Sequence, residues 1–475
     1  MTTFRDCALV LFAIGAVLAK GTPAFGAPGA TVVIESGALK GAVADGVESW
    51  KAIPYAAPPV GALRWRAPQP ALKWDGVRDA TAFANDCIQA VSPAAINALA
   101  KPPAEDCLYL NVWRPLNAGR KRPVLVWFHG GGYQVGGGSM PHYSGEALAK
   151  RGLVFVNLDF RLGRLGTFLH PQLVREGADG GRVGNYGYMD MIAALQWVHR
   201  NIAAFGGDPE NVTIMGQSSG GSAIWTLVTS PMARGLFKKA IAMSGGDTLD
   251  TRAGGPDATA AAGVAFAQTK GIAPDDPEAL AKLRRLPAEQ LTEGVSIPAI
   301  VNPGPGPRTF TPPYADGKFG VDAGLAIQDG TFAHVPMIIG ATSGDVGGPG
   351  GMMVAGSRKL SAAISKAGEP VYEYRFSYVA KSKGAARSQG APHGGDVPFF
   401  LDTFGADPRD KAAPPDMAMA ETISRYIVRF AETGDPNGSG LPRWPRYDRG
   451  ADRLMDFTED GHAAAKKDPQ TVPVR

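Results

Sequence analysis

The chain has 475 residues, of which 44% are hydrophobic and 19% are charged, an ordinary balance for a globular protein. Its formal net charge of +4 is small beside 48 basic and 44 acidic side chains, and no basic cluster stands out. These values argue against a nucleic-acid-binding protein and against strong attraction to anionic membranes. Because no long charged or low-complexity linker divides the chain, we expect residues 27–475 to form a single domain.

The N-terminal residues have the pattern of a signal peptide. Arg5 precedes the apolar run Ala8–Ala19, which is long enough for a signal-peptide core but too short to span a bilayer. Small residues around Ala24–Ala27 offer a cleavage site. We therefore expect residues 1–26 to be removed and the mature chain to be exported, periplasmic or secreted, with no stable membrane anchor.

The cysteine count agrees with export. Cleavage of the signal peptide would remove Cys7 and leave Cys87 and Cys107 as an even pair. A disulfide between them would close a loop of 107 − 87 = 20 positions, which stabilises the fold by roughly 3 kcal/mol in chain-entropy estimates. Two cysteines are too few for a structural zinc site, and neither H-E-x-x-H nor C-x-x-C occurs, so we expect no metal and no cofactor.

The apolar run Val124–Phe128 predicts a buried strand, and it leads directly into the sequence HGGG at positions 129–132. Without side chains at Gly131 and Gly132, two backbone N–H groups can point at one oxygen atom. The N–H of Ser219, further along the chain, can join them. These three residues are the predicted oxyanion hole.

A candidate nucleophile lies in the segment Gly216–Gly220, with the sequence GQSSG. An apolar run, Val212–Met215, precedes it, and the helix-like segment Gly221–Leu227 follows it. This order of strand, sharp turn and helix is typical of a serine held in a strained conformation with its hydroxyl exposed. Ser218 is the predicted nucleophile, and it needs a base within hydrogen-bond reach.

Two segments that follow, Asp257–Thr269 and Pro277–Leu291, predict helices. The apolar run Val335–Gly340 predicts another strand, and the loop after it contains Asp345 as its only carboxylate. Asp345 is therefore the predicted triad acid, which would orient a histidine and stabilise its charged form. The rival acids precede that strand in polar, turn-rich sequence, where solvated surface carboxylates are the default: they are Asp316, Asp322 and Asp329.

The general base can be chosen by elimination among seven histidines. If the order is serine, acid, histidine, only His334, His393 and His462 remain. His334 leaves little room for the acid and precedes a strand, and His462 lies in a polar tail where disorder is expected. His393 follows the predicted strand 371–378 in a glycine-containing loop, so it is the predicted base.

Beyond these residues, the chain resembles the type-B carboxylesterases of the α/β-hydrolase superfamily, which include bacterial carboxylesterases and cholinesterases. The stretches that carry the resemblance are Ile53–Gly61 with Leu63–Trp65, Glu105–Val112, Gly184–Gly187 with Asn201–Pro209, and Phe430–Asn437. The resemblance implies an α/β-hydrolase fold, with a mostly parallel central sheet and helices on both faces. It also implies ester hydrolysis by Ser218, Asp345 and His393, the assignment already reached from the residues.

The chain departs from the usual family pattern at three places. Gln217 and Ser219 replace the glutamate and alanine common beside the nucleophile, which predicts an altered pH dependence with the chemistry retained. The acid is Asp345 where glutamate is more common. The stretch 347–357 between the acid loop and the predicted helix Ser357–Ala367 is short, which predicts a reduced lid and a more open acyl site.

The expected partner is a small ester, uncharged or weakly polar. Residues 88–106 contain no aromatic side chain that could bind a quaternary ammonium group, so a choline ester is not expected. Tyr133, Trp225 and Phe399 are candidates to line the pocket, with core packing as the alternative role. Two other functions stay open: an amidase or peptidase with the same triad, and a non-catalytic binding protein on this fold. The sequence does not specify the oligomeric state.

Overall fold

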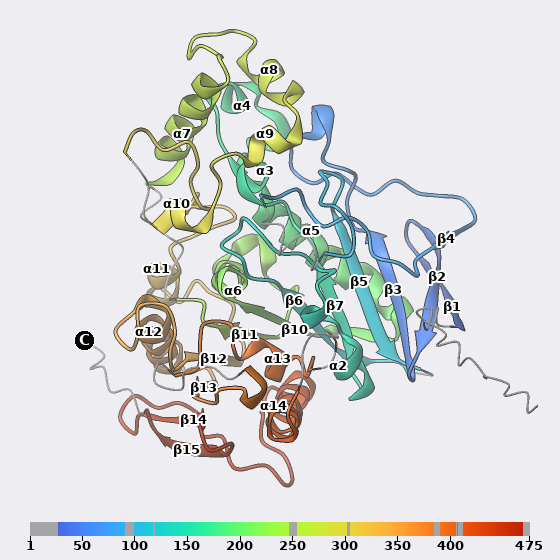
Figure 1. Cartoon of the computed structure of the whole chain (residues 1–475), viewed down its shortest axis with the longest axis vertical. Coiled ribbons are helices and arrows are strands. Elements are labelled where there is room, and N and C mark those ends of the chain that lie inside the picture. The colour runs from blue at the N-terminus through green and yellow to red at the C-terminus, as the bar shows by residue number, and fades with distance from the viewer. Residues whose placement is uncertain are drawn as a thin grey trace, which may run out of the picture.

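The computed structural model describes residues 27–90, 99–116, 119–246, 254–301, 305–383, 390–404, 406 and 412–468. The predicted signal peptide lies outside the described residues. One large sheet runs through the molecule (Figure 1) in the order β1-β2-β3-β5-β7-β6-β10-β11-β12-β13-β14-β15, with β4 beside β2. The strands from β7 through β14 in this order run parallel. The remaining strands pair in antiparallel fashion, except β4, which runs parallel to β2.

The central strands contain or overlap the predicted apolar runs, with ends that differ by up to five residues. The strands are β1 (Ala27–Ile34), β2 (Gly37–Ala44), β3 (Val47–Pro54), β4 (Val77–Asp79), β5 (Tyr109–Pro115), β6 (Arg122–Phe128), β7 (Val154–Leu158), β10 (Gly207–Gln217), β11 (Lys239–Met243), β12 (Met337–Thr342), β13 (Val371–Phe376), β14 (Arg453–Phe457) and β15 (Ala463–Lys467). A separate two-stranded sheet joins β8 (Thr167–Phe168) and β9 (Gly184–Asn185).

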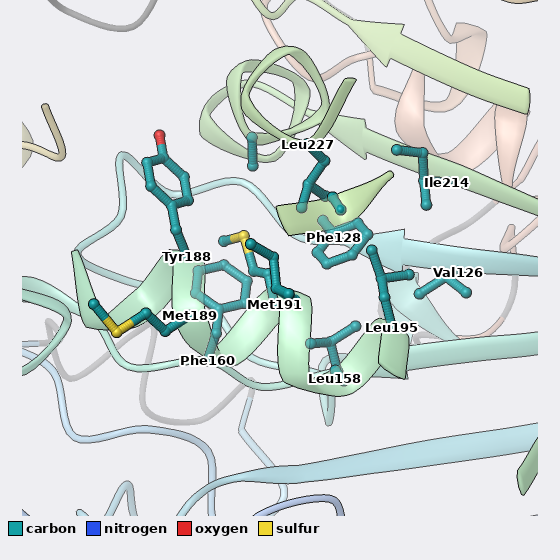
Figure 2. Packing of buried hydrophobic residues seen from close by; sticks show 14 of the residues in the cluster. Val126, Phe128, Leu158, Phe160, Tyr188, Met189, Met191, Leu195, Ile214 and Leu227 are labelled. Atoms are coloured by element: carbon teal, nitrogen blue, oxygen red, sulfur yellow. The ribbon is translucent and has the colours of Figure 1, made fainter. Parts of the chain in front are cut away.

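The central strands are continuous apolar runs because both of their faces are buried. In β6, Val126 and Phe128 belong to the hydrophobic cluster on one face, whereas Leu125 and Trp127 belong to the cluster on the other face. Figure 2 shows Val126 and Phe128 among the side chains of neighbouring strands and helices, including Leu195. A strand of this kind is favoured only inside a sheet that is covered on both sides.

Helices cover both faces of the sheet, as the sequence predicted. One face is covered by α5 (Tyr186–Asn201), α6 (Ser219–Thr229), α11 (Ala323–Gln328) and α12 (Met352–Lys366). The other is covered by α2 (Glu146–Lys150), α13 (Val397–Phe400) and α14 (Pro414–Thr433). Short 3₁₀ turns occupy Gly61–Leu63, Pro141–Tyr143, Ala178–Gly180, Ile202–Phe205, Pro231–Ala233 and Lys381–Lys383.

A group of short helices forms a cap at one end of the molecule, at the top of Figure 1. They are α3 (Gly163–Gly166), α4 (Pro171–Glu176), α7 (Gly255–Thr269), α8 (Ala279–Arg285), α9 (Ala288–Thr292) and α10 (Ile297–Val301). The two predicted helical segments thus correspond to α7 and to the pair α8 and α9. Arg164 of α3 anchors the cap, because its guanidinium donates to Leu291 O at 2.9 Å and to Glu293 O at 2.6 Å.

Two local predictions need correction. Helix α12 begins at Met352, earlier than the predicted Ser357, because the side chain of Val354 is buried against the core and extends the helical face. His462 does not lie in a disordered tail: it lies in the turn of the β14–β15 hairpin. β14 pairs with β13, so the tail is ordered by hydrogen bonds to the sheet that its own polar sequence does not predict. Every helix of the described residues is too short or too polar to cross a bilayer.

Candidate active site

The predicted site residues follow the ends of four parallel strands. The oxyanion loop follows β6, Ser218 follows β10, Asp345 follows β12, and His393 lies in the loop after β13. The carboxyl ends of parallel strands meet at the same edge of a sheet, where α/β proteins bind their ligands. The pairing of β10 with β6, which places Gly216 opposite Phe128, brings the nucleophile turn next to the oxyanion loop.

Ser218 lies in a strained turn between β10 and α6. Its backbone has φ 57° and ψ −124°, a conformation that non-glycine residues rarely adopt. The two flanking glycines are required by close backbone contacts: a Cβ at Gly216 would lie 2.5 Å from Gly220 O, and a Cβ at Gly220 would collide with Phe128 O. Glycine is therefore required two residues before and two residues after Ser218, because at both positions neighbouring backbone leaves no room for a side chain.

The structure brings the three predicted triad residues into one hydrogen-bonded line. His393 Nε2 lies 2.8 Å from Ser218 Oγ, and His393 Nδ1 lies 2.6 Å from Asp345 Oδ1. With the proton on Nδ1 donated to the carboxylate, Nε2 is free to accept from the serine hydroxyl. The Asp345 side chain is fully buried, whereas the His393 side chain is 27% exposed, so a substrate can approach the histidine but not the acid.

Asp345 is held as a carboxylate by several donors. Its Oδ2 accepts from Ser244 Oγ at 2.6 Å and from the Thr342 N–H and hydroxyl at 3.1 and 3.0 Å, and its Oδ1 accepts from Val346 N at 2.8 Å. Burial alone would raise the pKa of Asp345, but the hydrogen bond and charge of His393, with these donors, hold it below the ordinary value.

The imidazole responds in the opposite direction. Burial alone would lower the pKa of His393, but the hydrogen bond and negative charge of Asp345, with the charge of Asp396, raise it above the ordinary value. An imidazolium at His393 is therefore stabilised by its surroundings.

The loop that carries His393 is attached directly to the acid loop. Gly344 N donates to Ala391 O at 2.8 Å, and Ala391 N donates to Ser343 Oγ at 2.9 Å. Gly390, with φ +76°, makes this approach possible, because a Cβ there would lie 2.5 Å from Ser343 Oγ. Aspartate is one methylene shorter than glutamate. The contacts between the two loops bring the histidine within hydrogen-bond distance of this shorter side chain.

The predicted oxyanion residues lie beside the nucleophile. Gly131 and Gly132 have φ of +112° and +64°, and a Cβ at Gly131 would collide with Val135 O. Ser219 is the first residue of α6, and its hydroxyl accepts from Tyr133 N at 3.3 Å. Within the described part of the chain, no hydrogen bond involves the N–H of Gly131 or Gly132.

His129, which opens the HGGG sequence, has a structural role. Its ring stacks on Phe160 with a centroid distance of 4.4 Å and an interplanar angle of 14°. Its Nδ1 lies 2.8 Å from Gly130 O. Burial lowers the pKa of His129 to about 4, so the ring is neutral at ordinary pH and cannot serve as a charged group in the site.

Gln217 lies beside the histidine, as the expected effect on pH dependence requires: its Nε2 is 3.3 Å from His393 Nε2. Two other residues of the site, Ser244 and Asp396, were not predicted. Ser244 Oγ donates to Asp345. Asp396, three residues after the histidine, is fully buried, and its Oδ2 accepts from Tyr374 Oη at 2.8 Å. Burial raises the pKa of Asp396 to about 6. The one sequence signal for Asp396 was its position three residues after His393, because an acid so close along the chain can lie near the histidine.

The other candidates lie elsewhere. Asp322 caps the N-terminus of α11 and Asp316 accepts from Asn185 Nδ2 at 2.9 Å, while Asp329 is an exposed residue at the end of α11. His334 Nδ1 pairs with Glu369 at 3.0 Å and not with the site. Among the described residues, no group of three or more His, Cys, Asp or Glu side chains is arranged to hold a metal ion.

A small apolar cavity of about 210 Å³ lies beside His393. Its lining includes Tyr378, Val379, Phe399 and Phe404. Of the three residues considered for the pocket, Phe399 lines this cavity, Trp225 is buried in the core, and Tyr133 packs against Tyr188 with a hydroxyl–hydroxyl distance of 3.1 Å. Cys87 and Cys107 form the predicted disulfide.

Comparison with known proteins gives a consistent picture. The carboxylesterase family matches residues 28–366 and 349–472. Fumonisin B1 esterase of Sphingopyxis macrogoltabida is 34% identical over 89% of this chain and 85% of its own length. Para-nitrobenzyl esterase of Bacillus subtilis (strain 168) is 33% identical over 88% of this chain and 92% of its own length.

Solved structures agree with the sequence relatives. A PNB esterase structure superposes with a TM-score of 0.77 and 29% identity, covering 92% of this chain and 97% of the other. A thermophilic PNB esterase gives a TM-score of 0.78 over 92% of this chain and 98% of the other. The chain has the α/β-hydrolase fold, it is an ester hydrolase, and it belongs to the carboxylesterase family.

Proposed function

We propose that the protein hydrolyses carboxylic esters through an acyl-enzyme intermediate formed on Ser218. The observation that carries the proposal is the continuous line from Ser218 Oγ to His393 Nε2 and from His393 Nδ1 to Asp345 Oδ1, at 2.8 and 2.6 Å. His393 takes the serine proton as Oγ attacks the ester carbonyl, and it then donates that proton to the departing alcohol. A water molecule then attacks the acyl-enzyme in the same way. His393 takes the proton of this water and returns it to Ser218 Oγ, and the carboxylic acid is released.

The negative oxygen formed in each attack needs donors that are already in place. The N–H groups of Gly131, Gly132 and Ser219 would supply them. Each such donor contributes about 3 kcal/mol of transition-state stabilisation in serine hydrolases. The positive φ angles of the two glycines support this role, because they turn the peptide planes without a Cβ that would block the approach of a carbonyl.

The substrate is proposed to be an uncharged or weakly polar ester. The apolar cavity beside His393, with Phe399 and Phe404 in its lining, favours an aromatic or short aliphatic group over a charged one. Because His393 protonates the leaving oxygen, a group bound in this cavity is placed on the alcohol side of the ester. A p-nitrobenzyl ester is a suitable test compound, since one relative is named para-nitrobenzyl esterase.

The proposal is tested with purified mature protein on p-nitrophenyl esters of increasing acyl length, beside p-nitrobenzyl esters and matched anilides. We expect turnover of esters and a much slower reaction with anilides, because an amine is a poorer leaving group. Mass spectrometry after quenching should find the acyl group on the peptide that contains Ser218. Comparable turnover of anilides would support an amidase, and no turnover of either would support a binding protein.

We also propose that the chain is exported and folds as one catalytic domain. The disulfide between Cys87 and Cys107 supports export, since such bonds persist mainly in oxidising compartments. The single large sheet that joins the described segments from β1 to β15 supports one domain. N-terminal sequencing of protein recovered from the periplasm or medium should begin near Ala27.

A further inference from the structure

The oxyanion loop reverses direction immediately after its glycines. Gln134 N and Val135 N both donate to Gly131 O, at 3.0 and 3.1 Å. The place of Gly131 therefore depends on where the returning segment 136–139 is attached. That segment is held by buried side chains from two other parts of the chain.

Gln89 makes the first attachment. Its Nε2 donates to Gly136 O at 2.7 Å, and its Oε1 accepts from Gly136 N at 2.8 Å, so one amide side chain holds both backbone polar groups of Gly136. Gly136 itself packs on His129, since a Cβ there would collide with His129 Nδ1. The start of the returning segment is thus fixed on both sides.

Asp86 and Asp159 make the second attachment. Asp86 Oδ1 accepts from Ser139 N at 3.1 Å, and its Oδ2 accepts from Ser139 Oγ. Asp159, which follows β7, accepts from Gly138 N at 2.8 Å. Both residues are buried, Asp86 at 1% and Asp159 at 4% exposed. Consecutive residues of the loop are therefore held by two buried carboxyl groups that influence each other's pKa.

Two neighbouring buried carboxylates repel each other and have no donor, whereas a single proton lets one carboxyl group donate to the other. Burial raises the pKa of both groups, and the negative charge of Asp86 raises that of Asp159 further. A single proton on Asp159 would let it donate to Asp86. The pair would then have one negative charge, which accepts from the Ser139 N–H and hydroxyl.

The other charged and titratable groups nearby have their own partners. Tyr55 Oη donates to the backbone oxygen of Asp159 at 2.6 Å. Arg161, two residues after Asp159, directs its guanidinium to Asp190 Oδ1 at 2.7 Å. The pKa of the Asp159 carboxyl is raised by burial and by the charge of Asp86, and it is lowered by the hydrogen bond from the Gly138 N–H. Burial raises the pKa of Tyr55, and the charge of Asp159 in turn helps to raise it.

We propose that Asp86 and Asp159 are positioning residues that share one proton and so hold the oxyanion loop in its active geometry. The proposal rests on the proposed function of that loop. Loss of the shared proton would leave two anions in contact in a buried site, and their repulsion would loosen the attachments of Gly138 and Ser139. The oxyanion donors would then be misplaced, which lowers kcat more than it changes KM.

The test compares wild-type protein with Asp159→Asn and Asp159→Leu. The asparagine amide can donate to Asp86 and its oxygen can accept from Gly138, and it has no proton to lose. We expect kcat for p-nitrophenyl acetate to fall reversibly at alkaline pH in wild type, and Asp159→Asn to keep wild-type kcat at neutral pH without that fall. Asp159→Leu should lose on the order of tenfold or more in kcat with little change in KM.

Two controls separate this role from general destabilisation. Circular dichroism at each pH excludes unfolding, and affinity for a trifluoromethyl ketone, which forms an oxyanion on Ser218, should fall at alkaline pH in wild type but not in Asp159→Asn. Identical pH profiles for wild type and Asp159→Asn would overturn the shared proton, whether or not either profile falls. Failure of the proposed function would appear separately, as full activity in Ser218→Ala at neutral pH.

Discussion

Gln217 Nε2 lies 3.3 Å from Nε2 of His393, the same nitrogen that faces the Ser218 hydroxyl. The neutral amide can donate to the free base but adds no charge that would stabilise the imidazolium. Gln217, the residue before the proposed nucleophile, is therefore in a position to influence the pKa of His393, the proposed base.

We expect Gln217→Glu to raise the pKa of His393 further above its ordinary value, because a carboxylate beside the ring favours the charged form. The base must be neutral to accept a proton, so the acid limb of the kcat/KM profile should move to higher pH while the plateau activity is retained. Gln217→Ala is the matched control and should leave the limb near its wild-type position. A glutamate variant with an unmoved limb would contradict the contact.

The hydrogen bond between Ser218 and His393 predicts strongly non-additive mutations. Ser218→Ala and His393→Ala should each reduce kcat by a factor on the order of 10⁶, and the double variant should be little worse, because the two side chains act as a unit. Steady-state kinetics on one p-nitrophenyl ester, with circular dichroism to check the fold, measures this. Independent losses that multiply in the double variant would argue against the pairing.

The acid can be tested against its rivals. Asp345→Asn should greatly reduce kcat, because the amide can stabilise the wrong tautomer of His393 and carries no charge for the imidazolium. Asp316→Asn and Asp322→Asn serve as controls, since these residues contact Asn185 and the start of α11 and should leave kcat largely intact. An equally severe loss in either control would move the assignment away from Asp345.

The oxyanion loop gives a prediction from backbone geometry. Gly131→Ala should abolish most activity, because its Cβ would collide with Val135 O and the loop would have to move. Gly271→Ala is the matched control: its φ is also positive, at +71°, but no atom lies within 4 Å of the new Cβ. The control should lose some thermal stability with normal kcat. If both variants had equal kcat, the loop would not be placing the donors.

Glu373 predicts a pH-dependent cost to stability. Its carboxyl group, on β13, has no hydrogen-bond partner among the described residues, and burial raises its pKa to about 8 although Arg375 and Arg358 act to lower it. The folded protein keeps the group neutral while the unfolded chain ionises it above about 4.5, so wild type loses stability as the pH rises from 4.5 toward 8.

Glu373→Gln removes this ionisation. The difference in unfolding free energy between variant and wild type should grow in favour of the variant by up to roughly 1.4 kcal/mol per pH unit in that range. Urea unfolding at a series of pH values measures the difference, and activity should be unchanged because Glu373 does not contact the triad. A difference that is constant with pH would show that Glu373 is ionised in the folded protein.

The local signals for the site lie in short stretches of sequence that each follow a strand. Ser218 could be identified because the turn around it needs glycines at fixed positions, and Asp345 and His393 because few acids and histidines follow the later strands. The same reasoning did not find Ser244 or Asp396, which have no motif of their own. Their roles arise from contacts with Asp345 and Tyr374 across neighbouring strands.

The sequence by itself determined the central parallel strands, the helices at 257–269 and 277–291, the sharp turn at Ser218, the glycine loop after β6 and the disulfide pair, because these depend on local periodicity, glycine positions and residue counts. Tertiary structure alone decided which distant groups meet: Ser244 with Asp345, Asp86 and Asp159 with consecutive residues of the oxyanion loop, and the C-terminal residues as a hairpin on β13. The physical reason is that a side chain's charge and hydrogen bonds are set by neighbours in space, and sheet pairing brings together residues whose separation along the chain carries no signal.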